Sequence, residues 1–294
     1  MPQKKSGLIA CNTNVFLHCM LGNERLLGGK IMSGWNKEKL QRYIKEERGQ
    51  GEKGSYIPWT KTHEFSSKGR ATRILGIKTQ RIHHLHSDNQ LRAFHMFEWS
   101  ENIIDIREGF PLLDVMDVID DKENLRFDKF RDKESGEQLV LTTSFLLTIR
   151  DVDGKERYLA RAIKDSSELT RKITFEKLEI ENRYWKAREI DWKVITDKQF
   201  SRQFIKNIEW VRETLLSIEQ RDINKDQLSD ELLNHLLSNP DSAIRNSLMD
   251  FDKRTGVSIG TGLYLFRYLI AKKDIKIDMR NKIDPMARII DLLL

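Results

Sequence analysis

The clearest candidate for a catalytic residue is Lys164, the last residue of the segment "LVLTTSFLLTIRDVDGKERYLARAIK". This segment predicts two β-strands, 139–150 and 155–164, joined by a tight turn at 151–154. Side chains alternate between the two faces of a strand, so residues 162 and 164 point to the same face. A lysine at such a place can orient or deprotonate water in phosphodiester cleavage when nearby carboxylates hold Mg²⁺. The question is which carboxylates would hold the metal.

In the PD-(D/E)xK nuclease pattern, carboxylates lie on a helix, on the strand before the lysine, and two residues ahead of the lysine. The corresponding places in this chain are Gln90, Ser144 and Ala162. Gln90 and Ser144 can offer oxygen ligands, but both are neutral, and Mg²⁺ normally demands at least one or two carboxylates. Gln90 could also have a purely structural role, because it completes the helix-capping pattern Ser87-x-x-Gln90.

Other acids could in principle replace the missing ligands. Asp88 lies about 200° around the helix axis from position 90, and Asp165 points to the opposite strand face from Lys164. Neither is therefore a simple substitute. The candidates for a relocated carboxylate are Asp88, Glu98, Glu101, Asp165 and Glu181.

The elements that must position these residues form an α/β domain. Leu91, Phe94 and Phe97 recur at helical spacing in one core helix. A second amphipathic helix at 170–189 has Phe175, Leu178 and Trp185 as its predicted core residues, and an apolar strand at 192–197 follows it. Helix, hairpin, helix and strand in this order predict a small mixed sheet with flanking helices.

The chain after residue 197 has a different pattern. Four amphipathic helical segments are followed by the β-like segment 275–279, which is the outline of a winged-helix domain. We therefore predict domains at 32–197 and 198–294. We interpret residues 1–31 as an untranslated leader, because the Gly-Gly-Lys-Ile sequence before Met32 is what an in-frame bacterial ribosome-binding sequence encodes. We expect translation to start at Met32.

Positive charge gathers in two segments of this chain of net charge +6. Residues 35–92 hold thirteen Lys and Arg against six Asp and Glu, and residues 253–288 hold nine against three. Two basic segments suit a long polyanion such as DNA, because phosphate contacts add along the backbone. Two solvated faces are the alternative. The predicted DNA-binding residues are Lys68, Arg70, Arg73, Lys78, Arg81, His83 and His84.

Composition argues against disulfides, thiolate metal sites and membrane spans in most of this chain. Both cysteines lie near the start, at Cys11 and Cys19, so no disulfide or thiolate metal site is expected further along, which fits a reducing bacterial cytoplasm. No apolar run approaches the roughly 18 residues of a membrane span. His83, His84 and His86 invite a zinc interpretation, but no cysteine or spaced fourth ligand accompanies them.

Several ordered motifs resemble the TnsA family, the restriction-endonuclease-like subunit of heteromeric cut-and-paste transposons. They are "ERGQGEKGSYIPW", "HHLHSDNQLRAFHMFEW", "IIDIREGFPLL", "TTSFLLTI", "FEKLEIENRYW" and "NIEWVRETL", and they span most of residues 40–216. The resemblance implies a restriction-endonuclease-like fold and Mg²⁺-dependent 5′-strand cleavage at transposon ends. It also implies transposon-end DNA, a TnsB-like transposase and a TnsC-like ATPase as partners.

Carried over to this chain, the family's helix glutamate falls on Gln90 and its strand aspartate on Ser144. The glutamine before the lysine falls on Ala162, and the catalytic lysine falls on Lys164. Only the lysine matches, so we predict that Mg²⁺ binds poorly and that cleavage is lost. Three hypotheses stay open: a nuclease whose acids were lost or relocated, a non-catalytic DNA-binding and assembly subunit, and an unrelated winged-helix regulator.

Overall fold

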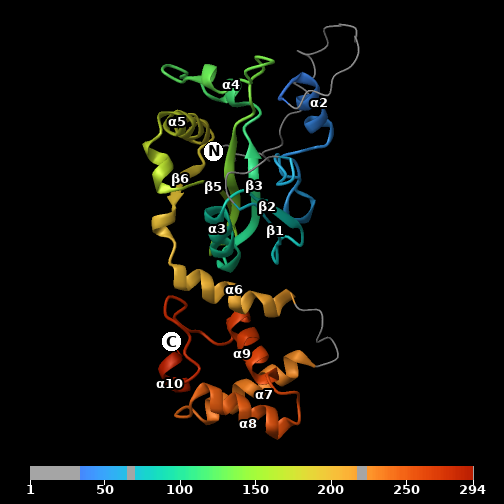
Figure 1. Cartoon of the computed structure of the whole chain (residues 1–294), viewed down its shortest axis with the longest axis vertical. Coiled ribbons are helices and arrows are strands. Elements are labelled where there is room, and N and C mark those ends of the chain that lie inside the picture. Colours follow the sequence, from blue (N-terminus) through green and yellow to red (C-terminus); the bar gives the residue numbers. More distant parts are fainter. Residues whose placement is uncertain (1–33, 65–69, 217–223, 294) are drawn as a thin grey trace, which may run out of the picture.

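The computed structural model describes residues 34–64, 70–216 and 224–293. The chain forms an α/β unit followed by a helical unit, stacked along the long axis of the molecule (Figure 1). The expected start at Met32 and the predicted DNA-binding residue Lys68 both lie outside the described residues.

A four-stranded sheet with the order β3-β4-β5-β6 forms the centre of the α/β unit. Its strands are β3 (Ile103–Pro111), β4 (Thr142–Arg150), β5 (Glu156–Lys164) and β6 (Asp191–Thr196). The first two pairings are antiparallel, and β5 pairs with β6 in parallel. The predicted hairpin is thus present as β4 and β5, with Gly154 in the turn at a φ of +75° that suits glycine.

Two helices cover the sheet, α3 (Asp88–Trp99) and α5 (Lys172–Ala187). Phe94 and Phe97 of α3 pack with Phe145 of β4 in one core cluster. Trp185 of α5 packs with Leu146 in another. The mixed sheet with flanking helices is therefore as predicted.

Phe175 departs from the predicted core of α5, since its side chain is 57% exposed while Leu178 and Trp185 are buried. Helical spacing places Phe175 close to the same face as Leu178. Burial, however, also requires a facing element over the first turn of the helix, which spacing alone does not reveal.

The rest of the α/β unit consists of short elements. The strands β1 (Thr72–Leu75) and β2 (Ile82–Leu85) form a separate antiparallel pair. The remaining helices of this unit are α2 (Lys37–Lys45), η1 (Lys53–Ser55), α4 (Val115–Val118), η2 (Phe127–Lys129), η3 (Ser166–Thr170) and η4 (Asp197–Gln199).

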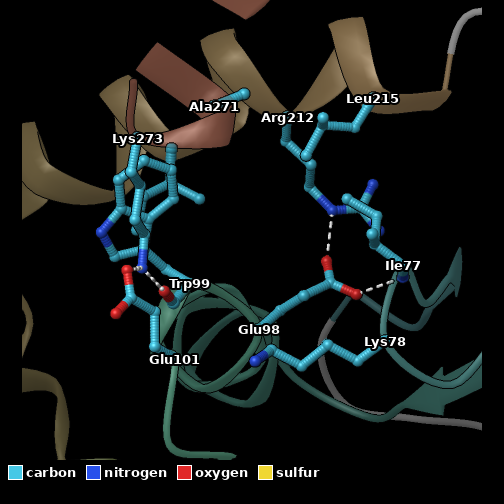
Figure 2. Close-up of a pocket in the computed structure, with 10 residues that line it drawn as sticks. Ile77, Lys78, Glu98, Trp99, Glu101, Arg212, Leu215, Ala271 and Lys273 are labelled. Atoms are coloured by element: carbon cyan, nitrogen blue, oxygen red, sulfur yellow. Dashed lines mark hydrogen bonds and ion pairs between the residues drawn. The ribbon is translucent and has the colours of Figure 1, made fainter. Parts of the chain in front are cut away.

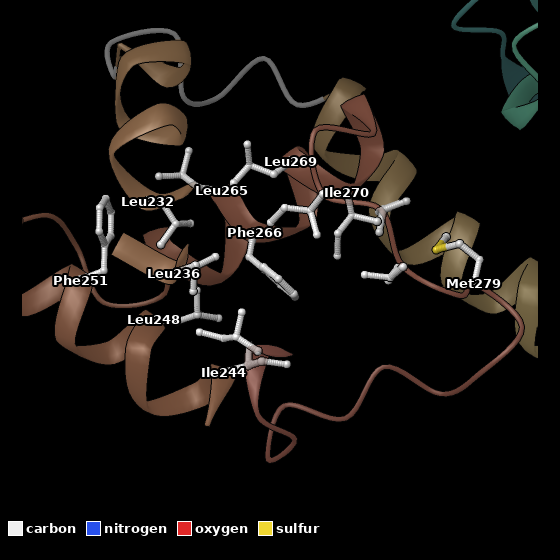
Figure 3. Close-up of a cluster of buried hydrophobic side chains, with 14 of the residues drawn as sticks. Leu232, Leu236, Ile244, Leu248, Phe251, Leu265, Phe266, Leu269, Ile270 and Met279 are labelled. Atoms are coloured by element: carbon white, nitrogen blue, oxygen red, sulfur yellow. The ribbon is translucent and has the colours of Figure 1, made fainter. Parts of the chain in front are cut away.

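The helical unit has its own apolar core, shown in Figure 3, in which Leu232, Phe251 and Leu265 are fully buried. A Cβ on Gly262 would lie 2.8 Å from the Leu248 carbonyl oxygen, so glycine permits the close approach of α8 (Ile244–Thr255) and α9 (Thr261–Lys272). The helices are α6 (Arg202–Leu216), α7 (Lys225–Ser238), α8 (Ile244–Thr255), α9 (Thr261–Lys272) and α10 (Ile289–Leu292).

The predicted β-like segment 275–279 forms a single bridge, between Ile277 and Leu293, and no strand. Ile275, Ile277 and Met279 are instead buried against the helical core. Among the helices in the described parts of the chain, none has the length and apolar character to cross a membrane.

The two units meet around a cavity of about 140 Å³, shown in Figure 2. Nε of Arg212, on α6, lies 2.6 Å from Oε2 of Glu98 on α3, and both side chains are buried. Nζ of Lys273 donates to the Trp99 carbonyl at 2.9 Å and pairs with Glu101 at 2.7 Å. Trp99 itself packs against the core of the helical unit. Buried ionic and apolar contacts therefore join the units.

Candidate functional site

Gln90 lies in the first turn of α3, where the sequence pattern predicted a helix cap. Oγ of Ser87 accepts a hydrogen bond from the Gln90 N–H at 3.2 Å, as a capping serine does. Oε1 of Gln90 in turn accepts from the backbone N–H of His86 at 2.7 Å. The amide oxygen of Gln90 is thus already engaged in holding the start of α3.

Ser144 lies on β4, beside the end of its ladder with β5. The paired residues begin at Phe145 and Arg161, and Oγ of Ser144 accepts from the Ile163 N–H at 2.9 Å. The hydroxyl therefore stabilises the approach of the two strands. Ala162 is buried and brings no polar side chain to this place.

The start of α3 and the end of β5 lie together. Nδ2 of Asn89 is 3.5 Å from Oδ2 of Asp165, which follows Lys164 directly. The Ser144 hydroxyl binds the residue that precedes Lys164. The structure therefore brings the four family positions, Gln90, Ser144, Ala162 and Lys164, into one region.

Lys164 is the charged residue among these four positions, with 19% of its side chain exposed. Its ion pair with Glu168 is long, with 3.8 Å between Nζ and Oε2. Burial is the main cause that lowers the pKa of Lys164, and the neighbouring ammonium of Lys177 lowers it further. Glu181 and Glu168 act in the opposite direction. Two cationic side chains thus lie close enough to repel each other.

Lys177 and Glu181 belong to a partly buried network on α5. Nζ of Lys177 lies 3.0 Å from Oε1 of Glu181 and donates to the Thr142 carbonyl at 2.7 Å. Oε2 of Glu181, whose side chain is 1% exposed, accepts from Oγ1 of Thr143 at 3.0 Å. Nε1 of Trp185 completes the network by donating to the same Oγ1 at 2.7 Å. Both carboxylate oxygens of Glu181 are therefore engaged.

Comparison with known proteins gives two matching family models and one related protein. A family model described as the TnsA-like endonuclease N terminal matches residues 100–197, and one described as the TnsA endonuclease C terminal matches residues 199–279. The transposon Tn7 transposition protein TnsA of Escherichia coli is 35% identical over 254 residues, covering 85% of this chain and 89% of that protein. This chain belongs to the TnsA family. The resemblance inferred from the motifs is confirmed, and with it a place among transposition proteins that act on DNA.

Of the five acids considered as replacements for the family's ligands, Glu181 is the one whose charge acts on Lys164 and raises its pKa. Glu98 and Glu101 lie at the junction of the two units, paired with Arg212 and Lys273. Asp165 caps η3, where its side chain accepts from the Ser167 N–H. Asp88 is exposed at the start of α3.

Sequence reasoning missed two charged residues near Lys164, namely Lys177 and Glu168. The spacing of Lys177 and Glu181, four residues apart on a predicted helix, was a signal for the first. Glu168 also lies four residues after its partner Lys164, but across the end of a strand, where helical spacing predicts nothing.

Endonucleases of the TnsA family are generally metal-dependent, so the relevant property of this site is whether its side-chain oxygens can hold Mg²⁺. The oxygens of Gln90 and Ser144 accept backbone hydrogen bonds, and those of Glu181 are bound by Lys177 and Thr143. Within the described residues, no group of three or more His, Cys, Asp or Glu could hold a metal ion. Mg²⁺ prefers near-octahedral oxygen ligands with carboxylate charge, so these residues do not fit it.

The predicted DNA-binding residues fall into different environments. Arg70 and Arg73 are exposed, and Arg73 pairs with the half-buried His84 across β1 and β2. Lys78 lies at the junction cavity and donates to the carbonyls of Ser100 at 2.6 Å and Ile103 at 2.5 Å. Its ammonium therefore serves as a structural donor in this conformation.

Arg81 and His83 lie inside the protein, around the buried carboxylate of Glu108. The guanidinium of Arg81 binds Glu108 at 2.8 and 2.5 Å, and Nδ1 of His83 lies 2.7 Å from Oε2. Burial opposes ionisation of Glu108, but the hydrogen bonds from Arg81 and His83 outweigh it and lower its pKa to about 2. These two side chains are not available to DNA in this conformation.

The three neighbouring histidines also point to separate partners. His83 binds Thr79 and Glu108, Nδ1 of His84 accepts from the Thr62 N–H at 3.2 Å, and Nε2 of His86 lies 3.0 Å from Oγ1 of Thr60. The imidazoles of His83 and His84 on β2, and of His86 just after it, thus have separate partners.

Proposed function

We propose that this chain acts in transposition as a non-cleaving TnsA-family subunit, which binds transposon-end DNA and assembles with a TnsB-like transposase and a TnsC-like ATPase. One observation carries the proposal: the metal positions of the family hold Gln90 and Ser144, whose oxygens are neutral and bound to backbone N–H groups. The partners are those implied by the resemblance to the family. The E. coli relative is itself named a transposition protein.

The rest of the site supports retention of the scaffold. Lys164 keeps its position at the end of β5, and the core of the α/β unit around Phe94, Phe145 and Trp185 is intact. Losing two carboxylates therefore removes metal binding without removing the fold. Arg70, Arg73 and His84 remain candidates for contacts to DNA phosphates, because part of each side chain is accessible.

Strand cleavage tests this proposal. The duplex is the element's own transposon end, with the TnsB-like transposase present, in Mg²⁺ and in Mn²⁺. We expect no 5′-strand cleavage by the unaltered protein and cleavage by the double variant Gln90→Glu with Ser144→Asp. Cleavage by the unaltered protein that is lost on Lys164→Met would overturn the proposal.

A second candidate, a nuclease with a relocated carboxylate, is favoured by the position of Glu181 beside Lys164. In that case the unaltered protein cleaves, and Glu181→Gln abolishes cleavage. Under our proposal neither protein cleaves, so the same assay separates the two functions.

A further inference from the structure

We propose that Lys164 and Lys177 together form a binding site for one DNA phosphate that works without a metal ion. The inference rests on the proposed function, because it concerns how a non-cleaving subunit holds the DNA strand that its relatives cut. It adds a ligand, a phosphodiester group, and a second lysine, Lys177, to a site where the family pattern has metal ligands.

The two ammonium groups come from different elements and are both partly open to solvent. Lys164 ends β5 with 19% of its side chain exposed, and Lys177 on α5 has 24% exposed. Nζ of Lys177 binds the carbonyl of Thr142, the first residue of β4, at 2.7 Å. Because β4 and β5 are antiparallel, the start of β4 lies beside the end of β5, where Lys164 is the last residue. Two amines held near each other in a partly buried place are stabilised by an anion between them. A phosphodiester oxygen is the anion that DNA supplies there.

Lys177 is held in place and still has a free donor. Of the three donors on its ammonium group, one binds the Thr142 carbonyl and one faces Glu181. Glu181 is fixed in turn by Thr143. The third N–H of Lys177 can therefore bind a ligand without breaking this network.

Lys164 is free to take a new partner as well. Its contact with Glu168, at 3.8 Å, is too long for a hydrogen bond, and the Glu168 side chain is 39% exposed. A phosphate oxygen at hydrogen-bond distance would bind Lys164 more closely than this carboxylate does. Arg171 and Lys172 are exposed at the start of α5 and add positive charge to the helix that carries Lys177.

The neutral residues at positions 90 and 144 also favour phosphate binding. Carboxylates at these places would repel a DNA phosphate unless a cation lay between them. Gln90 and Ser144 remove that repulsion and bind backbone N–H groups instead. The substitutions that remove metal binding therefore also allow the lysines to bind phosphate directly.

The first test is the salt dependence of binding to a fluorescein-labelled DNA duplex in EDTA, measured by fluorescence anisotropy. Each lost phosphate contact lowers the slope of log K against log salt by about 0.9. We expect this decrease for Lys164→Met and for the pair Lys177→Met with Glu181→Gln. The pair leaves the net charge unchanged and no carboxylate unpaired, so a lower slope reports the site and not the total charge.

Lys186→Met is the matched control. Lys186 is exposed on the same helix, nine residues after Lys177 and thus about 180° around the axis, so its removal should leave the slope unchanged. Lys164→Met tests the site by itself if the pair variant does not fold, which its thermal unfolding would reveal. Slopes equal to that of the unaltered protein in both site variants would overturn the inference.

The second test restores the carboxylates with Gln90→Glu and Ser144→Asp. We expect the double variant to bind the duplex about tenfold or more weakly than the unaltered protein in EDTA, because two negative charges return beside the phosphate. Mg²⁺ should reduce this ratio, with denaturing gels checking that the DNA stays intact. An equal affinity of both proteins in EDTA would contradict the inference.

The two proposals fail differently. If the unaltered protein binds no DNA, or cuts it, the proposed function falls. If it binds DNA without cutting and the slopes do not respond to the lysines, the function stands and only the phosphate site at Lys164 and Lys177 is lost.

Discussion

Two buried glutamates of the α/β unit, Glu108 and Glu181, have very different surroundings. Glu108 binds the guanidinium of Arg81 through both oxygens, and it also accepts from the His84 N–H at 3.0 Å and contacts His83. Glu181 has one charged partner, Lys177, and one hydroxyl, that of Thr143. Both carboxylates are almost fully buried, at 2% and 1% exposure.

The difference lies in how far the partners are themselves buried. Arg81 and His83 are 7% and 0% exposed, so the Glu108 cluster is closed on itself. Lys177 is 24% exposed and adjoins Lys164, so the Glu181 network ends at an accessible cation. A closed ionic cluster holds a fold together, whereas an open one also presents charge to a ligand.

The largest effect should come from Glu108→Gln. It leaves the charge of Arg81 buried without a counter-ion, and breaking such a pair costs about 3–5 kcal/mol of unfolding free energy. Urea denaturation measures this loss. Glu156→Gln is the control, because its pair with Arg150 is half exposed on both sides and should contribute at most about 1 kcal/mol. Equal losses in the two variants would remove the distinction between closed and open pairs.

The stability of the protein at low pH should depend on the same cluster around Glu108. The pKa of Glu108 is lowered from 4.5 to about 2, so its contribution is fully present above pH 4.5 and is lost as the pH falls towards 2. A shift of this size corresponds to a contribution of the order of 3 kcal/mol. Denaturation across this pH range should therefore weaken the unaltered protein more than Glu108→Gln. Parallel pH profiles for the two proteins would contradict the assignment.

Glu181→Gln should destabilise the protein less than Glu108→Gln does. Lys177 can turn towards water when its partner is neutral, so we expect a loss of about 1.5–3 kcal/mol, typical of a hydrogen bond to a charged group. Urea denaturation beside Glu108→Gln makes the comparison direct. A loss equal to or above that of Glu108→Gln would show that the Glu181 network is as closed as the other.

The sequence predicted the local elements well, for reasons visible in single residues. Ser87 caps α3 as the pattern indicated, and the turn before Lys155 joins β4 and β5. These features depend on neighbours in the chain. The β-like segment 275–279 forms one bridge and no strand, because its apolar residues pack on helices, an alternative that β-like alternation does not exclude.

The sequence was a weaker guide to which charged residues are exposed than to the helices and strands. Arg81 and His83 looked like members of a basic surface, yet they meet Glu108, which lies 27 and 25 residues further along the chain. Charge density in a segment says nothing about such a distant partner. Only the fold therefore shows that Arg81 and His83 are buried.

The sequence by itself determined the family, the order of helix, hairpin, helix and strand in the α/β unit, and the neutral residues at positions 90 and 144. These follow from residue identity and short-range pattern. Only the tertiary structure decided that Glu108 closes around Arg81 and His83, and that Lys177 of α5 lies beside Lys164 of β5. The physical reason is that burial and charge interactions depend on distance in space, which packing of the sheet and its helices sets.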